Sequence, residues 1–226
     1  MTGLCQFCHE TEVCNDNDQA STCVECASLN RHEVFQKNWT NLRESKELGF
    51  LKLREKCEKM FPFVIKYEFT YTPIHFLDEI QHKKDESAES FLQTYCLEIF
   101  RDVVPVKVVN DGDSFYNSIA CLGDLNGDFV LELRIRNVIE LVLKANVYKY
   151  NYKAFVPVVD QSLEEYVLND MLQNQRFSKI YDFMSMPSVL KINIKSIYPS
   201  VNGLVDQQAK MLSNQTFVPY GGADGQ

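Results

Sequence analysis

The chain has 226 residues, with 23 Lys and Arg against 31 Asp and Glu, and therefore a formal net charge of −8. This length predicts one medium domain with a small satellite, or two small domains. A hydrophobic fraction of 45% excludes disorder as the state of the whole chain. The acidic balance argues against non-specific binding of duplex DNA, which requires clustered Lys and Arg.

The sequence contains no candidate membrane span and no secretory signal. The longest apolar stretches, residues 103–109 and 135–143, are far shorter than the roughly 20 residues that a bilayer core requires. The first ten residues lack the basic and apolar regions of a signal peptide. Because eight cysteines occur without such a signal, we expect an intracellular protein of the nucleus or cytoplasm, with no membrane partner.

Residues 1–40 are cysteine-rich and have no helical or strand periodicity. They contain two Cys-x2-Cys pairs separated by 14 residues: Cys5, Cys8, Cys23 and Cys26. Two such pairs complete the tetrahedral shell that Zn²⁺ prefers, so we expect a structural zinc module whose metal-binding energy folds the segment. The alternatives are four incidental thiols, or disulfides in an oxidising compartment. Cys14, His9 and His32 are further possible ligands, any of which could replace a cysteine.

Residues 41–90 are expected to form a connecting region with a helix and a strand. Apolar and charged residues interleave at helical spacing from about 35 to 59. Aromatic and apolar residues then alternate with other side chains over 63–71, which predicts a strand with one buried face. After a charged loop, a helix is expected to run through residues 91–101.

Residues 91–220 carry the most regular pattern and are expected to form the main domain, followed by a flexible tail over 221–226. The expected elements are a strand over 103–109, helices over 115–122, 129–148 and 162–172, a short helical segment over 187–190 and a strand over 192–198. In the long helix, Glu132 and Arg136 are expected on the solvated side, opposite an apolar stripe. This order predicts an α+β fold, with a small sheet flanked by helices beside the zinc module.

An acidic, glycine-containing loop precedes the helix that begins near Ser114, in the stretch 111–119 (DGDSFYNSI). A helix N-terminus gathers unpaired N–H groups and partial positive charge, so it favours a nucleophile or an anion. The alternative interpretation is that Asp113 or Ser114 only caps the helix.

This stretch resembles the D-G-[ND]-C-[LF]-[FY]-x-[SA]-[IV] motif of the ovarian-tumour (OTU) cysteine proteases, in which the cysteine opens a helix. Residues 131–148 resemble the long helix that follows in that family, and residues 183–199 resemble its short helix and strand before a final hairpin. The resemblance covers about residues 100–220 and is closest to the divergent branch that contains vertnin and transposon-associated proteins. It implies an OTU-like domain and a protein partner such as ubiquitin or a ubiquitin-like protein.

The departures from the family motif bear on catalysis. Ser114 stands at the nucleophile position, in a degenerate site that also contains Asp111. A serine hydroxyl is not ionised near neutral pH and depends on a general base, whereas a thiol ionises more readily. All four histidines precede Ser114, and the chain ends about where the family's last strand and its histidine would begin. The sequence therefore predicts a non-catalytic OTU-like binding module, a pseudoenzyme.

Two other functions stay open at this stage. One is a serine- or cysteine-type ubiquitin-directed hydrolase, in which His75 or His82 would serve Ser114 as a base from upstream. The other is a transposon-derived, nucleic-acid-associated regulator whose zinc module contacts DNA, although Lys and Arg are sparse in residues 1–30. Three remaining cysteines are expected to act as small core residues: Cys57, Cys96 and Cys121.

Overall fold

The computed structural model describes residues 2–4, 12–14, 29–96, 103–151, 161–197, 200 and 214–220. The helices are α2 (Arg31–Glu44), α3 (Phe50–Val64), α4 (Glu86–Tyr95), α5 (Ser114–Leu122), α6 (Asp128–Leu143), α7 (Ala145–Asn151), α8 (Leu163–Tyr166) and α9 (Ile180–Leu190), with a 3-10 turn η1 (Ser45–Leu48) and a π-helical turn η3 (Val167–Met171). The strands are β1 (Thr2–Leu4), β2 (Glu12–Cys14), β3 (Ile194–Lys195) and β4 (Thr216–Phe217). They form two separate antiparallel pairs, β1 with β2 and β3 with β4. The predicted α+β class is therefore wrong, because the described chain is predominantly helical.

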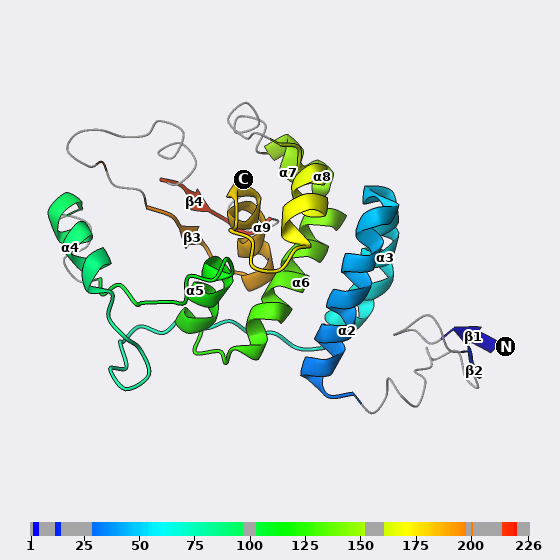
Figure 1. The fold of residues 1–226 in the computed structure, drawn as a ribbon, viewed down its shortest axis with the longest axis horizontal. Helices are drawn as coiled ribbons and strands as arrows, with labels where there is room; N and C mark the ends of the chain where they lie inside the picture. Colours follow the sequence, from blue (N-terminus) through cyan, green and yellow to red (C-terminus); the bar gives the residue numbers. More distant parts are fainter. Residues whose placement is uncertain are drawn as a thin grey trace.

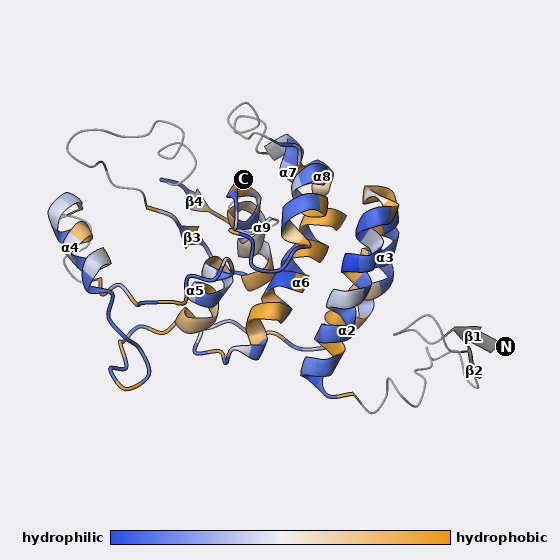
Figure 2. Cartoon of the chain, in the orientation of Figure 1, coloured by the Kyte–Doolittle hydropathy of each residue, from blue (hydrophilic) through white to orange (hydrophobic). Residues whose placement is uncertain are grey.

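Helix α6 lies at the centre of the molecule, with α2 and α3 on one side and α5 and α9 on the other (Figure 1). Hydrophobic residues gather where α2 and α3 face α6 (Figure 2). The sequence predicted that only one stripe of this helix would be buried, and that is wrong. Glu132 is 3% exposed and the Arg136 side chain is 11% exposed, so the side expected to face solvent is also covered.

One hydrophobic core joins the first helices to the last ones. Phe35 and Trp39 of α2 are buried in the same cluster as Ile135 of α6, Tyr181 of α9 and Phe217 of β4. A second, smaller cluster lies around α5 and contains buried residues of α5, α6 and α9. Helices α2 and α3 therefore share a core with α6 and α9.

Capping residues fix the starts of two helices. Asn30 and Glu33 form a capping box at the start of α2, where each side chain binds the other's backbone amide. Ser162 and Glu165 form the same motif at α8, as their spacing in the sequence predicts. In each helix the N-cap amide and the third amide of the first turn thus have local side-chain acceptors.

The segment 63–71 does not form the predicted strand. Helix α3 continues to Val64, Ile65–Tyr67 then form a turn and a bend, and residues 68–71 belong to no strand. Arginine side chains bind its backbone instead: Arg136 Nη2 donates to the Tyr67 carbonyl at 2.6 Å, and Arg31 Nη2 donates to the Glu68 carbonyl at 3.1 Å. Alternation of apolar and polar residues indicates only which side chains point inward. A strand also requires a neighbouring strand that pairs with its backbone.

The other predicted strands are shorter than expected. Residues 103–109 make one isolated antiparallel bridge, between Lys84 and Val106. The strand predicted over 192–198 is only β3, which pairs Ile194 with Phe217 of β4. The preceding helical segment is longer than predicted, since α9 begins at Ile180.

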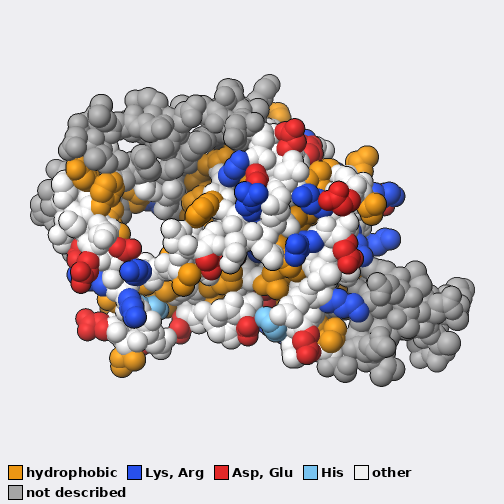
Figure 3. Space-filling model, in the orientation of Figure 1, with side chains coloured by type: hydrophobic (Ala, Val, Ile, Leu, Met, Phe, Trp, Pro, Cys, Tyr) orange, Lys and Arg blue, Asp and Glu red, His pale blue; other side chains and the backbone are white. Residues whose placement is uncertain are grey.

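The surface carries charges of both signs. Lys and Arg side chains are interspersed with Asp and Glu over the face shown in Figure 3. In the parts of the chain that the structure describes, no helix has both the length and the apolar character needed to cross a bilayer. The longest of them, α6, has 16 residues and a buried Glu132 and Arg134.

Candidate functional site

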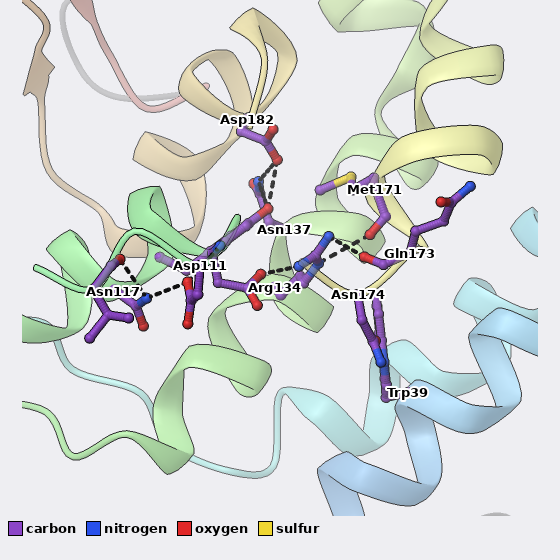
Figure 4. Close-up of polar contacts among 12 residues, drawn as sticks. Trp39, Asp111, Asn117, Arg134, Asn137, Met171, Gln173, Asn174 and Asp182 are labelled. Atoms are coloured by element: carbon purple, nitrogen blue, oxygen red, sulfur yellow. Dashed lines mark hydrogen bonds and ion pairs between the residues drawn. The ribbon is translucent and has the colours of Figure 1, made fainter. Parts of the chain in front are cut away.

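The loop before α5 is closed by the carboxylate of Asp111. Its Oδ1 accepts hydrogen bonds from the Asp113 amide at 2.9 Å and from Asn117 Nδ2 at 3.0 Å (Figure 4). Asn117 Nδ2 also donates a hydrogen bond to the Val109 carbonyl at 3.3 Å. Helix α5 begins at Ser114, as the sequence predicts, but Asp113 at the cap position makes no capping hydrogen bond with its side chain. Asp111 therefore ties the loop to the first turn of the helix.

Gly112 allows this loop to lie directly against another turn of the chain. Its φ is +89°, and a Cβ atom there would lie 2.2 Å from the backbone oxygen of Gln175. Both the backbone conformation and the lack of space require glycine at this position. The glycine of the predicted motif thus has a structural role in this chain.

Arg134 of α6 connects the loop to the turn that follows η3. Its guanidinium forms an ion pair with Asp113, and it donates hydrogen bonds to the carbonyls of Met171 at 3.1 Å and Gln173 at 2.5 Å (Figure 4). The Arg134 side chain is only 5% exposed. A buried guanidinium is tolerated when its donors are satisfied, and here two segments supply three acceptors.

Aromatic rings enclose the same guanidinium. Its carbon lies 5.3 Å from the centre of the Trp39 ring and 5.6 Å from that of the Tyr116 ring, within the range of cation–π attraction. Burial raises the pKa of the Asp113 carboxyl, and the positive charge of Arg134 opposes that rise. The loop carboxylates are therefore engaged in holding the fold.

A fully buried carboxylate, that of Asp182 on α9, lies behind the loop. Its two oxygens accept hydrogen bonds from the hydroxyls of Tyr116, at 2.6 Å, and Tyr166, and from Asn137 Nδ2 at 3.1 Å and the Lys179 amide at 3.0 Å. Burial raises the pKa of Asp182, and the hydrogen bonds from the two tyrosines counteract that rise. This network fixes α5, α6, α8 and α9 relative to one another.

Ser114, which stands at the nucleophile position of the resembled family, has no base beside it among the described residues. In the described residues its hydroxyl makes no hydrogen bond, to a histidine or to any other group. His32 lies at the start of α2, where its Nδ1 is 3.4 Å from Asp128. His82 accepts a hydrogen bond from the backbone of its own loop at 3.3 Å, and the structure gives His75 no polar contact. The structure thus brings Asp111 and Ser114 together in one loop but places no described histidine in contact with Ser114.

A cavity of about 320 Å³ lies beside α5. Asn117 and Cys121 of α5 line it together with His82, and Ser114 is not among its lining residues. Burial raises the pKa of the Cys121 thiol and the nearby Asp124 raises it further, so this thiol is not activated as a nucleophile. Here a histidine and a thiol share a cavity without the electrostatics of a catalytic pair.

The three cysteines outside the N-terminal segment differ in burial. Cys57 is 0% exposed, and burial raises its pKa, which confirms its predicted role as a small core residue. Cys96 and Cys121 are half-buried rather than part of the core.

The predicted zinc ligands Cys5, Cys8, Cys23 and Cys26, as well as the alternative ligand His9, lie outside the described residues. Strands β1 and β2 pair Thr2 with Cys14 and Leu4 with Glu12, so Cys5 and Cys8 fall in the sequence between two paired strands. Within the described residues, no group of three or more His, Cys, Asp or Glu side chains is arranged to hold a metal ion.

The sequence interpretation missed the polar residues that organise the site: Arg134, Asn137 and Asp182. One signal was available on α6, where Glu132, Arg134 and Arg136 are each two residues apart. Neighbours at that spacing point to opposite sides of a helix, so polar groups on both sides indicate a helix with polar partners on more than one face.

Comparison of the chain with protein-family models, with curated proteins and with solved structures finds no match. The resemblance to OTU proteases therefore stays a prediction. What the site can do follows from its own geometry: a closed, ion-paired loop, a serine without a base among the described residues, and a neighbouring cavity.

Proposed function

We propose that this chain is a non-catalytic, OTU-like protein-binding module with a structural zinc site in its N-terminal segment. One observation carries the proposal: the carboxylates of the loop before α5 hold the fold, while the Ser114 hydroxyl has no base within reach in the described chain. A serine nucleophile needs a general base at hydrogen-bond distance. The loop therefore serves as a rigid structural element.

An exposed apolar patch beside α5 supports a protein partner. We define the patch as Phe76, Ile80 and Leu122, which are 87%, 96% and 45% exposed. The Ile74 amide donates to the Leu122 carbonyl at 2.7 Å, which ties the start of the segment to the end of α5. The Ile80 amide donates to Asp78 at 2.9 Å, within the turn of the segment itself. Exposed apolar side chains held on an ordered segment are typical of interaction sites.

Titration of isotope-labelled ubiquitin with the full chain tests the partner. We expect saturable shifts of the ubiquitin resonances, lost in the double variant Phe76→Ser/Ile80→Ser. The matched control is Leu48→Ser/Leu51→Ser, which changes two residues that are 67% and 77% exposed elsewhere. An unchanged ubiquitin spectrum would overturn the proposed partner, and an equal loss in the control pair would overturn the proposed surface.

Metal analysis of the purified chain tests the zinc site. We expect one zinc per chain, lost in the double variant Cys5→Ser/Cys23→Ser because each Cys-x2-Cys pair then supplies only one thiolate. Cys121→Ser is the control, since Cys121 lines the cavity beside α5 and should not affect metal content. Full zinc retention in the double variant would exclude these ligands.

A further inference from the structure

A second cavity, of about 370 Å³, opens where the C-terminal parts of α3, α6 and α9 meet. Val64, Ile139 and Val189 supply apolar walls from these three helices. Phe61 and Tyr220 also line it, and they are 42% and 50% exposed. The volume is within the range of about 300–1,000 Å³ that is usual for small-molecule sites.

Two charged groups of this cavity are already bound within the protein. Arg136 pairs with Glu132 at 2.7 Å. Glu140 accepts a hydrogen bond from the Tyr148 hydroxyl at 2.7 Å. The Arg136 charge is thus balanced within the protein, whereas the tyrosine hydroxyl is neutral and leaves Glu140 its negative charge.

Two lysines of the cavity are not bound in this way. The ammonium groups of Lys144 and Lys191 have no ion pair and no hydrogen bond within the described residues. Lys144 follows Glu140 by four residues, a spacing that allows a pair on a helix, and yet it forms none. The cavity therefore combines apolar walls with two exposed lysines and one carboxylate, so its unpaired positive groups outnumber its unpaired negative ones.

The backbone at Lys191 is unusual for a lysine. This residue ends α9 with φ +61° and ψ +30°, the left-handed conformation for which glycine or asparagine is preferred. The C-terminal end of α9 thus carries a long cationic side chain where a glycine would be less strained. Lys191 also lines the cavity.

We propose that this cavity binds a small amphipathic carboxylate. The apolar body lies against Val64, Ile139 and Val189, and the carboxylate lies between the ammonium groups of Lys144 and Lys191. The excess of positive groups favours an anionic headgroup, and the volume of about 370 Å³ suits a small ligand rather than a large partner surface. The site uses none of the residues of the apolar patch or of the loop before α5.

Calorimetric titration of the full chain with decanoate tests the proposal, with decanamide as the uncharged analogue. We expect one saturable site for decanoate, weakened by added salt, and binding of decanamide that is about tenfold weaker. No saturable decanoate binding, or equal binding of decanamide, would overturn the assignment. Saturation by an acidic peptide but not by decanoate would overturn the small-ligand class.

Lysine variants locate the headgroup. Lys144→Gln/Lys191→Gln should weaken decanoate binding about tenfold and leave decanamide binding unchanged. Lys195→Gln is the control, because the Lys195 side chain is exposed on β3, has no ion pair among the described residues and does not line the cavity. Lys191→Gly should weaken binding without loss of thermal stability, which separates the role of the charge from folding. Unchanged decanoate affinity in the double variant would exclude the two lysines as the headgroup site.

Discussion

Charged residues have different roles in the first half of α6 and just beyond its C-terminal end. Around its first half, Glu132 and Arg134 are buried, and both are paired with groups of the same chain. Beyond its last turn, Lys144 lies beside a cavity with Lys191, and neither has a partner in the described chain. The buried, paired charges fix how the segments pack together. The two lysines beside the cavity are available to a ligand. Substitutions in the two regions should therefore change different measurements.

The largest effect is expected for Arg134→Met. The methionine fills much of the volume but leaves Asp113 and the carbonyls of Met171 and Gln173 without their donor. We expect a loss of about 3 kcal/mol in the free energy of unfolding, measured by urea denaturation. The control Arg43→Met changes an exposed arginine and should stay within about 0.5 kcal/mol. A loss below about 1 kcal/mol for Arg134→Met would mean that the buried pair does not hold the loop.

The pH dependence sharpens this test. Burial raises the pKa of Asp113 in the folded state, so its contribution to stability is present below the unfolded-state pKa and is lost as pH rises through the folded-state pKa. Without Arg134 the folded-state pKa should rise further. The loss caused by Arg134→Met should therefore be smaller near pH 4 than near pH 7. An equal loss at both values would show that the charge of Asp113 is not involved.

A set of glycine variants tests the close contact of the loop. Gly112→Ala combines an unfavourable φ with a clash against Gln175, and we expect a loss of about 2 kcal/mol. Gly49→Ala has a similar φ of +85° but open space, and should lose about 1 kcal/mol. Gly127→Ala, at φ −59° with open space, should be neutral within about 0.5 kcal/mol. Equal losses of unfolding free energy for Gly112→Ala and Gly49→Ala would show that the contact with Gln175 does not contribute.

The smallest stability effect is expected on the unpaired side. Lys191→Gly relieves a left-handed conformation and should stabilise the fold by up to about 1 kcal/mol in thermal unfolding. A clear decrease would instead indicate that the lysine stabilises the C-terminal end of α9 through the helix dipole. In that case Lys191 would belong with the paired charges of the first region.

Local signals predicted local structure well. The Ser162 and Glu165 spacing predicts the start of α8, and the turn at residues 110–112 predicts the start of α5. The sheet could not be predicted correctly, because the alternation over 63–71 describes side-chain direction, and arginines from α2 and α6 take the place of a partner strand.

The buried polar network was beyond the reach of sequence patterns. Asp182 lies 66 residues from Tyr116 and 45 residues from Asn137 along the chain, so no local spacing indicates that they meet. The environment of Ser114 depends in the same way on where distant segments place their histidines. The OTU resemblance and the zinc ligands stay predictions.

The most direct test of the proposed non-catalytic role uses ubiquitin carrying a fluorophore on its C-terminal carboxyl group. Release of the fluorophore is measured for the natural chain, for Ser114→Cys and for Ser114→Ala. We predict no release above the enzyme-free rate in any of the three, because the part of the chain that the structure describes places no base beside a hydroxyl or a thiol at position 114. Release by the natural chain that disappears in Ser114→Ala would contradict this and identify the protein as a hydrolase.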